Sequence, residues 1–245
     1  MIVALASLNA FAAKSSYYYQ IKVYHLKTAS QEAMVDAYLK DAYLPALHRF
    51  GIDHVGVFKP VKQDSLDHLV YVFIPFKKID QYLKLDQALA IDKDYLSNGK
   101  NYLNASFNNT PYVRMESILL KAFDKMPSPA WPNLASNKAE RIYELRSYEA
   151  GTEQLSLNKI GMFNDAEINI FSKLNFNAVF YGQVISGSKM PNLMYLTTFN
   201  NKDDRDKHWL EFGSEYKKIS GLPQYQNNVS KNVTLFLYPA AYSDI

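Results

Sequence analysis

The side chains best suited to chemistry lie on two similar segments that each read as a β-strand, Tyr19-Gln-Ile-Lys-Val-Tyr24 and Tyr143-Glu-Leu-Arg-Ser-Tyr148. Alternate side chains of a strand lie on the same face, so Lys22 is expected beside Tyr24 and Arg146 beside Tyr148. A guanidinium can pair with two oxygens of a carboxylate or enolate at once. The pattern therefore predicts a site for a small, partly apolar or anionic molecule, formed by Lys22, Tyr24, Glu144, Arg146, Tyr148 and, from a later strand, Tyr181. The alternative is that Arg146 only pairs with Glu144 or another acid and stabilises the fold.

Histidine supplies the remaining candidate for acid–base chemistry. None of the five histidines has another histidine four residues away, so no metal site is predicted. His54 is the best candidate general base, because it is expected on a strand near the predicted site, and Arg146 would be its oxyanion partner. The sequence has no cysteine, no glycine-rich phosphate loop and no nucleophile elbow, so no cofactor is expected.

These residues sit in an internal repeat with an offset of 124 residues. Tyr19–Tyr24 matches Tyr143–Tyr148, residues 51–55 match 175–179, and Leu69–Phe73 matches Leu193–Thr197. An offset maintained over this length indicates two copies of one folding unit. The copies are predicted to span residues 17–121 and 140–245, with a proline-containing linker at 122–139.

Each copy is predicted to have the order β-α-β-β-α-β of a ferredoxin-like unit, which makes the fold class α+β. In the first copy we expect strands at 17–26, 53–59, 69–76 and 112–120, and helices at about 28–50 and 77–104. Pro45 should kink the first helix. The second copy repeats this order, with Asn200 or Asn201 capping its last helix.

Such a unit covers only one face of its sheet with helices. Two units in one chain should therefore pack their open faces together as an intrachain dimeric α/β-barrel that encloses a cleft. One face, which is mostly apolar, is predicted to face the helices; it consists of Tyr19, Ile21, Val23, Tyr143, Leu145 and Ser147. The set that contains Arg146 is then expected to face the cleft.

The ordered motifs of the second copy resemble those of a NIPSNAP domain. They are Tyr143-Glu-Leu-Arg-x-Tyr148, Phe176-Asn-x-Val-Phe-Tyr181-Gly-Gln-Val, Pro191-Asn-Leu-Met-Tyr195-Leu and Arg205-Asp-x-x-Trp209-x-x-Phe212. The first copy is similar to a diverged companion, in which Lys22 stands for Arg146 and Leu85 for Trp209. The resemblance implies a dimeric α/β-barrel fold. It also implies a superfamily that includes cofactor-independent monooxygenases, haem-handling proteins and small-molecule binders.

Composition and the N-terminus bear on location and partners. The chain is 48% hydrophobic and 21% charged, which is globular, and its net charge of +3 is dispersed, so nucleic acid is a poor partner. Residues 1–13 are apolar and end in Ala10-Phe11-Ala12, a pattern that signal peptidase accepts. Cleavage there would export the protein to the periplasm or the extracellular space and leave no membrane span; the alternative is an N-terminal helix.

We therefore predict an exported protein that binds a small molecule. Two alternatives stay open, a cofactor-independent monooxygenase or isomerase that uses His54 with Arg146, and a protein-interaction module with a packed interior. Assembly into a homo-oligomer is compatible with each of them.

Overall fold

The computed structural model describes residues 16–245, so the predicted signal segment lies outside the described residues and export stays a prediction. The first half forms β1 (Tyr18–Leu26), α1 (Ala29–Tyr38), the π-helical segment η1 (Leu39–Tyr43), α2 (Leu44–Arg49), β2 (Gly56–Pro60), β3 (His68–Phe76), α3 (Ile79–Ile91), α4 (Lys93–Asn98), α5 (Lys100–Leu103) and β4 (Arg114–Ala122). After the short helix η2 (Lys138–Glu140), the second half forms β5 (Ile142–Glu149), α6 (Glu153–Met162), the π-helical segment η3 (Phe163–Glu167), α7 (Ile168–Lys173), β6 (Phe180–Ser186), β7 (Asn192–Phe199), α8 (Lys202–Ser220), η4 (Pro223–Tyr225) and β8 (Lys231–Pro239).

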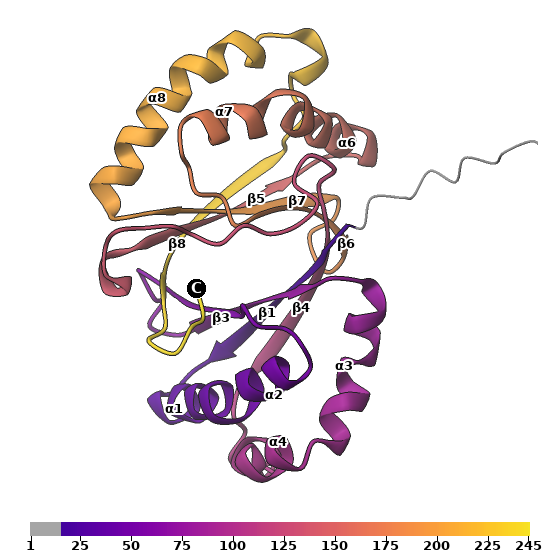
Figure 1. The fold of residues 1–245 in the computed structure, drawn as a ribbon, viewed down its shortest axis with the longest axis vertical. Coiled ribbons are helices and arrows are strands. Elements are labelled where there is room, and N and C mark those ends of the chain that lie inside the picture. Colours follow the sequence, from indigo (N-terminus) through magenta and orange to yellow (C-terminus); the bar gives the residue numbers. More distant parts are fainter. Residues whose placement is uncertain (1–15) are drawn as a thin grey trace, which may run out of the picture.

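The strands close into one antiparallel barrel in the order β1-β3-β2-β8-β5-β7-β6-β4. Each half contributes a four-stranded sheet, and the two sheets join where β2 pairs with β8 and where β4 pairs with β6. The helices of the first half cover one side of the barrel and those of the second half cover the opposite side (Figure 1). The predicted α+β fold with two βαββαβ repeats in an intrachain barrel is confirmed.

Local sequence explains where the main helices begin. Thr28, Thr152 and Asn201 cap the N-termini of α1, α6 and α8. The side-chain oxygen of each accepts a hydrogen bond from the backbone N–H of the residue three positions later. The predicted kink near Pro45 is present as η1, but an equivalent segment, η3, follows at the same offset of 124 without a proline. The π-helical segment therefore belongs to the repeat, and Pro45 alone does not explain it.

The repeat offset changes by one residue at the hairpin. Tyr19 pairs with Pro75 in the first half, whereas Tyr143 pairs with Thr198 in the second, so β7 follows β3 by 123 residues. The predicted match of Leu69 with Leu193 is therefore wrong. The caps of α3 and α8, at Lys78 and Asn201, share the offset of 123, so Trp209 corresponds to Asp86 and not to Leu85.

The assignment of the two strand faces is also corrected. The apolar set fills the barrel, where Tyr19, Ile21 and Val23 meet Tyr143 and Leu145 in one cluster. The set that contains Arg146 faces the helices, because Arg146 contacts Trp209 of α8 and Lys22 lies over the ring of Tyr43 in η1. An eight-stranded barrel has an interior that side chains just fill, so it takes the apolar set and leaves no broad cleft between the sheets.

The linker and the C-terminal segment both pack against the barrel. The backbone N–H groups of Phe123 and Ala130 donate to the carbonyls of Tyr181 and Val179. After β8, the Asp244 carboxylate accepts hydrogen bonds from His48 Nε2 at 2.8 Å and from the Val55 N–H at 2.7 Å. Within residues 16–245, no helix is both long enough and apolar enough to cross a membrane.

Candidate functional site

A pocket of about 490 Å³ lies on the helix-covered face of the second-half sheet. Strand β5 provides Arg146 and Tyr148, and α6 with η3 provides Lys159 and Glu167. The remaining walls come from α8 and from the segment that leads into β8, with Trp209, Phe212, Tyr216, Val229, Ser230, Lys231 and Asn232.

Arg146 is held in one orientation at the floor of this pocket. Its guanidinium lies 3.7 Å from the centroid of the Trp209 ring, so the cation rests on the aromatic face. Its Nε donates to Glu144, and its Nη1 donates to the hydroxyl of Tyr148 at 3.1 Å. No hydrogen bond within residues 16–245 uses the other terminal nitrogen, Nη2.

Glu144 anchors this arrangement from below. Its carboxylate is completely buried and accepts four hydrogen bonds, from Arg146 Nε, from Arg205 Nε and Nη2, and from Trp209 Nε1 at 2.9 Å. A buried carboxylate is costly unless such partners satisfy it. Strand alternation places Glu144 beside Arg146, and α8 supplies Arg205 and Trp209 one turn apart.

A second buried ion pair lies beside the first. The Lys159 ammonium contacts Glu167 and donates to the Tyr216 hydroxyl at 3.3 Å. Burial opposes the charge on Lys159, but Glu167 and the nearby phenols outweigh it and raise the pKa of the ammonium. Burial also raises the pKa of Glu167, against the effect of Lys159.

Two phenols extend the network toward the sheet. The hydroxyls of Tyr148 and Tyr195 lie 2.9 Å apart, so one donates to the other. Burial raises the pKa of Tyr195 well above its usual value, and this phenol therefore stays protonated at neutral pH. The two phenols therefore extend the network as hydrogen-bonding groups.

The charged side chains that line the pocket are three bases, Arg146, Lys159 and Lys231, and one acid, Glu167. Glu144 and Arg205 lie behind the floor and compensate each other. The pocket therefore carries a net positive charge in a partly desolvated setting, which attracts an anion.

The equivalent position in the first half is built differently. Lys22 lies 4.8 Å from the centroid of the Tyr43 ring, and burial lowers the pKa of its ammonium to about 8. Tyr24 is fully buried and packs edge-to-face against Tyr102 and Tyr112. Lys22 and Tyr24 are thus on the opposite side of the barrel from Arg146, and the six residues predicted to form one site are divided between the two halves.

Tyr181 and His54 are both separate from the Arg146 pocket. Tyr181 is buried in the second-half core and lines a different hollow, of about 390 Å³, with Trp131 and Phe171. His54 precedes β2 and stacks on Trp131 with ring centroids 4.2 Å apart. The predicted pairing of His54 with Arg146 is therefore not assembled.

Sequence reasoning missed Lys159, Glu167 and Arg205. Lys159 and Glu167 are charged residues about two helical turns apart in a helix that also buries Met162, Phe163 and Phe171, and this spacing was the available signal. The π-helical segment between them shifts the helix phase, so a regular 3.6-residue period would not bring the two side chains together. Trp209, a residue of the quoted motif, both lines the pocket and packs in the second-half core.

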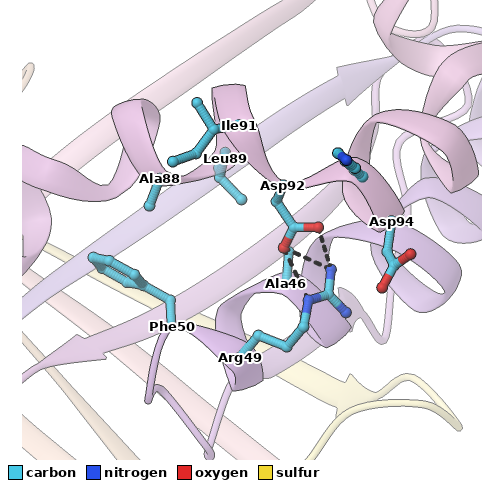
Figure 2. Close-up of a pocket in the computed structure, with 9 residues that line it drawn as sticks. Ala46, Arg49, Phe50, Ala88, Leu89, Ile91, Asp92 and Asp94 are labelled. Carbon is cyan, nitrogen blue, oxygen red and sulfur yellow. Dashed lines mark hydrogen bonds and ion pairs between the residues drawn. The ribbon is translucent and has the colours of Figure 1, made fainter.

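A hollow of similar size lies in the first half, between α2 and the α3–α4 junction (Figure 2). It has a volume of about 500 Å³, and its one arginine, Arg49, is already paired with Asp92. Nε and Nη2 of Arg49 donate to the two carboxylate oxygens at 2.9 and 2.8 Å. The acids Asp92 and Asp94 balance the bases Arg49 and Lys93 in this hollow, so it is a weaker candidate for an anion site than the Arg146 pocket.

Two ferredoxin-like units closed into one barrel within a single chain define a dimeric α/β-barrel protein. Solved structures share this fold over nearly the whole chain. A candidate monooxygenase from Fusobacterium nucleatum has 8% identity, a TM-score of 0.57, and coverage of 93% of this chain and 94% of its own. A candidate monooxygenase from Lactobacillus acidophilus has 10% identity, a TM-score of 0.54, and coverage of 91% and 94%. At these identities the similarity establishes the fold.

The family is given by sequence. Residues 143–244 match the NIPSNAP family model, so the second half of the chain is a NIPSNAP domain. The match includes Arg146 and every other residue that lines its pocket. Among curated proteins, none matches the chain.

Proposed function

We propose that this protein binds a small, planar, anionic molecule in the Arg146 pocket of its NIPSNAP domain. The observation that carries the proposal is Arg146 itself, which is fixed on the Trp209 ring while Nη2 keeps its donor capacity. A carboxylate would accept from this nitrogen, and the rings of Trp209 and Tyr216 would contact a flat apolar body.

The pocket is organised before the ligand arrives. Glu144, Arg205 and Trp209 hold Arg146 from below, and Tyr148 holds it from the side. A binding group that is already ordered loses little conformational entropy when the ligand docks. This favours binding by a fixed guanidinium over a role in which Arg146 only compensates Glu144, because Arg205 and Trp209 already donate three hydrogen bonds to that acid.

Binding is favoured over cofactor-independent catalysis by what surrounds Arg146. Catalysis of that kind requires a base close to the bound substrate. The two nearby carboxylates are engaged, Glu144 with two arginines and Glu167 with Lys159. The candidate base predicted from the sequence, His54, does not line the pocket.

Benzoate titration followed by Trp209 fluorescence tests the proposal. The chain has two tryptophans, so a Trp131→Phe background leaves Trp209 as the reporter. We expect benzoate to quench Trp209 and benzyl alcohol, its neutral analogue, to bind at least tenfold more weakly. Arg146→Met should weaken benzoate binding about 10- to 100-fold, the range for loss of a charge-assisted hydrogen bond.

Two further variants make the result decisive. Lys22→Met removes the base at the equivalent strand position of the first half and should leave benzoate affinity unchanged. Lys231→Gln, at an exposed position on the pocket rim, should weaken binding about two- to fivefold without a change in fold. Equal affinity for benzoate and benzyl alcohol, or unchanged affinity in a folded Arg146→Met variant, would refute an anion site.

A further inference from the structure

A separate pocket of about 170 Å³ occupies one mouth of the barrel. Its walls come from β1, β3 and β4 of the first half and from β5, β7 and β8 of the second. Apolar side chains such as Leu145, Met194 and Leu235 form its base, and Tyr71 forms part of its wall. Its volume is well below the ~300–1,000 Å³ of sites for drug-sized ligands, so it suits a molecule of a few heavy atoms.

Glu149 is the unusual residue of this mouth. It follows Leu145 and Ser147 on the inward face of β5, and its Oε1 is buried with no hydrogen-bond partner among residues 16–245. A buried carboxylate oxygen without a partner costs free energy. Within the same residues, Glu149 also makes no ion pair.

The other acid of the mouth is already satisfied, which makes Glu149 distinct. Glu116 Oε1 lies 3.1 Å from His25 Nε2, and Ser188 Oγ donates to Glu116 Oε2 at 3.4 Å. On its other side, His25 Nδ1 lies 2.9 Å from Asp67. His25 is therefore shared between two acids and has no ring nitrogen left for Glu149.

Lys189 is the remaining base that lines this pocket. It is exposed in the β6–β7 turn and has no carboxylate within 4.0 Å in the described part of the chain. The charged residues that line the pocket are two acids, Glu116 and Glu149, and two bases, His25 and Lys189, and Asp67 pairs with His25 from outside the lining. With Asp67 included, this group has three acids and two bases, so it carries a net negative charge even when His25 is protonated, opposite to the charge of the Arg146 pocket.

We propose that the barrel mouth is a second ligand site, which binds a small organic cation: an ammonium group on a short apolar body. The ammonium donates to Glu149 Oε1, and the apolar body packs against Leu145, Met194 and Leu235. Because both halves supply walls, this site exists only in the closed barrel and has no counterpart within a single repeat.

Methionine-methyl NMR with n-butylammonium tests this site in the whole chain. Met194 lines the mouth, whereas buried Met162 contacts Lys159 beside the Arg146 pocket, so the two ¹³C-methyl signals report on the two sites independently. We expect n-butylammonium to shift the Met194 signal and to leave Met162 unchanged. The neutral isostere 1-butanol and the anion butyrate should bind at least tenfold more weakly.

Glu149→Gln removes the charge and keeps the shape, and we expect it to weaken n-butylammonium binding at least tenfold. Glu140→Gln, an exposed acid outside the mouth, is the matched control and should bind as the unchanged chain does. Lys189→Gln removes the competing ammonium and should strengthen binding about two- to threefold. Equal binding of 1-butanol, unchanged binding in Glu149→Gln, or a Met194 signal that does not respond would each overturn the proposal.

Discussion

The two halves of the barrel have the same backbone fold but pack different side chains between their sheets and helices. Equivalent strand positions carry Glu144 and Arg146 in the second half and Gln20 and Lys22 in the first. In the second half the acid lies on the strand, and α8 brings Arg205 to it. In the first half the nearby acid is Asp86 on α3, which opposes the burial-driven fall in the pKa of Lys22. The comparison shows that only one copy builds a caged arginine.

The π-helical segments lie at equivalent places in both halves and serve each interior differently. Tyr43, at the end of η1, covers Lys22, whereas Glu167, at the end of η3, pairs with Lys159. At the position equivalent to Lys159 the first half has Val35, which is buried in an aromatic and aliphatic core. The π-helical segment thus directs one side chain toward the sheet in each copy. That side chain is a tyrosine over a lysine in the first half and a glutamate paired with a lysine in the second.

The largest expected effect comes from making the second half resemble the first at Glu144. Glu144→Gln copies Gln20 and leaves Arg146 and Arg205 without their shared acid, so we expect it to lower the free energy of unfolding by about 3–5 kcal/mol. Chemical denaturation at pH 7 measures this. Glu140→Gln, an exposed control, should change the value by less than about 0.5 kcal/mol. A loss below 1 kcal/mol in Glu144→Gln would mean that the cage is not a stabilising unit.

An intermediate effect is expected for the Lys159–Glu167 pair. Lys159→Val, which copies Val35, should cost about 3 kcal/mol because it leaves Glu167 buried and unpaired. Burial already raises the pKa of Glu167, and loss of Lys159 raises it further, so the folded state binds more protons than the unfolded state above the ordinary Glu pKa. The variant should therefore regain stability as the pH falls from 7 toward 5.

The double variant Lys159→Val/Glu167→Tyr completes the first-half pattern and provides the control. With both charges removed, the loss in free energy of unfolding should be about 1 kcal/mol or less, and the pH dependence added by Lys159→Val should disappear. Additive losses in the double variant, measured by denaturation at pH 5 and pH 7, would contradict a coupled ion pair.

The smallest effect is expected at Lys22. Burial lowers the pKa of its ammonium to about 8, so between pH 8 and the ordinary value near 10.5 the unfolded chain holds more protons and stability rises with pH. Lys22→Met should remove this rise in the free energy of unfolding with pH. At pH 7 the free energy of unfolding of the variant should exceed that of the unchanged chain by about 1–2 kcal/mol, after allowance for solvent screening. Arg146→Met should leave the rise in place, because arginine stays charged throughout.

A ¹⁵N-lysine NMR titration checks the Lys22 assignment directly. One lysine signal should titrate near pH 8 and should be absent in Lys22→Met. A Lys22 signal that titrates at the ordinary lysine value would remove the basis of this contrast between the halves.

Much of the fold follows from the sequence. The repeat, the βαββαβ order, the cap of the last helix at Asn201 and the similarity to NIPSNAP domains follow from the sequence, and the structure and the family match confirm them. Of the site, the sequence identified Glu144, Arg146 and Tyr148 as neighbours on one strand face, because alternation fixes which side chains lie together.

Which face turns inward was decided only by the tertiary structure. Both faces of these strands are buried, one against the helices and one inside the barrel. Alternation therefore divides the side chains into two faces but does not determine which face lies inside the barrel. Closure of eight strands admits only close-packed side chains and sends the ionic set outward, under the helices. The one-residue shift at the hairpin and the phase change at η3 then bring Trp209, Lys159 and Glu167 to Arg146, because each depends on contacts between segments distant in sequence.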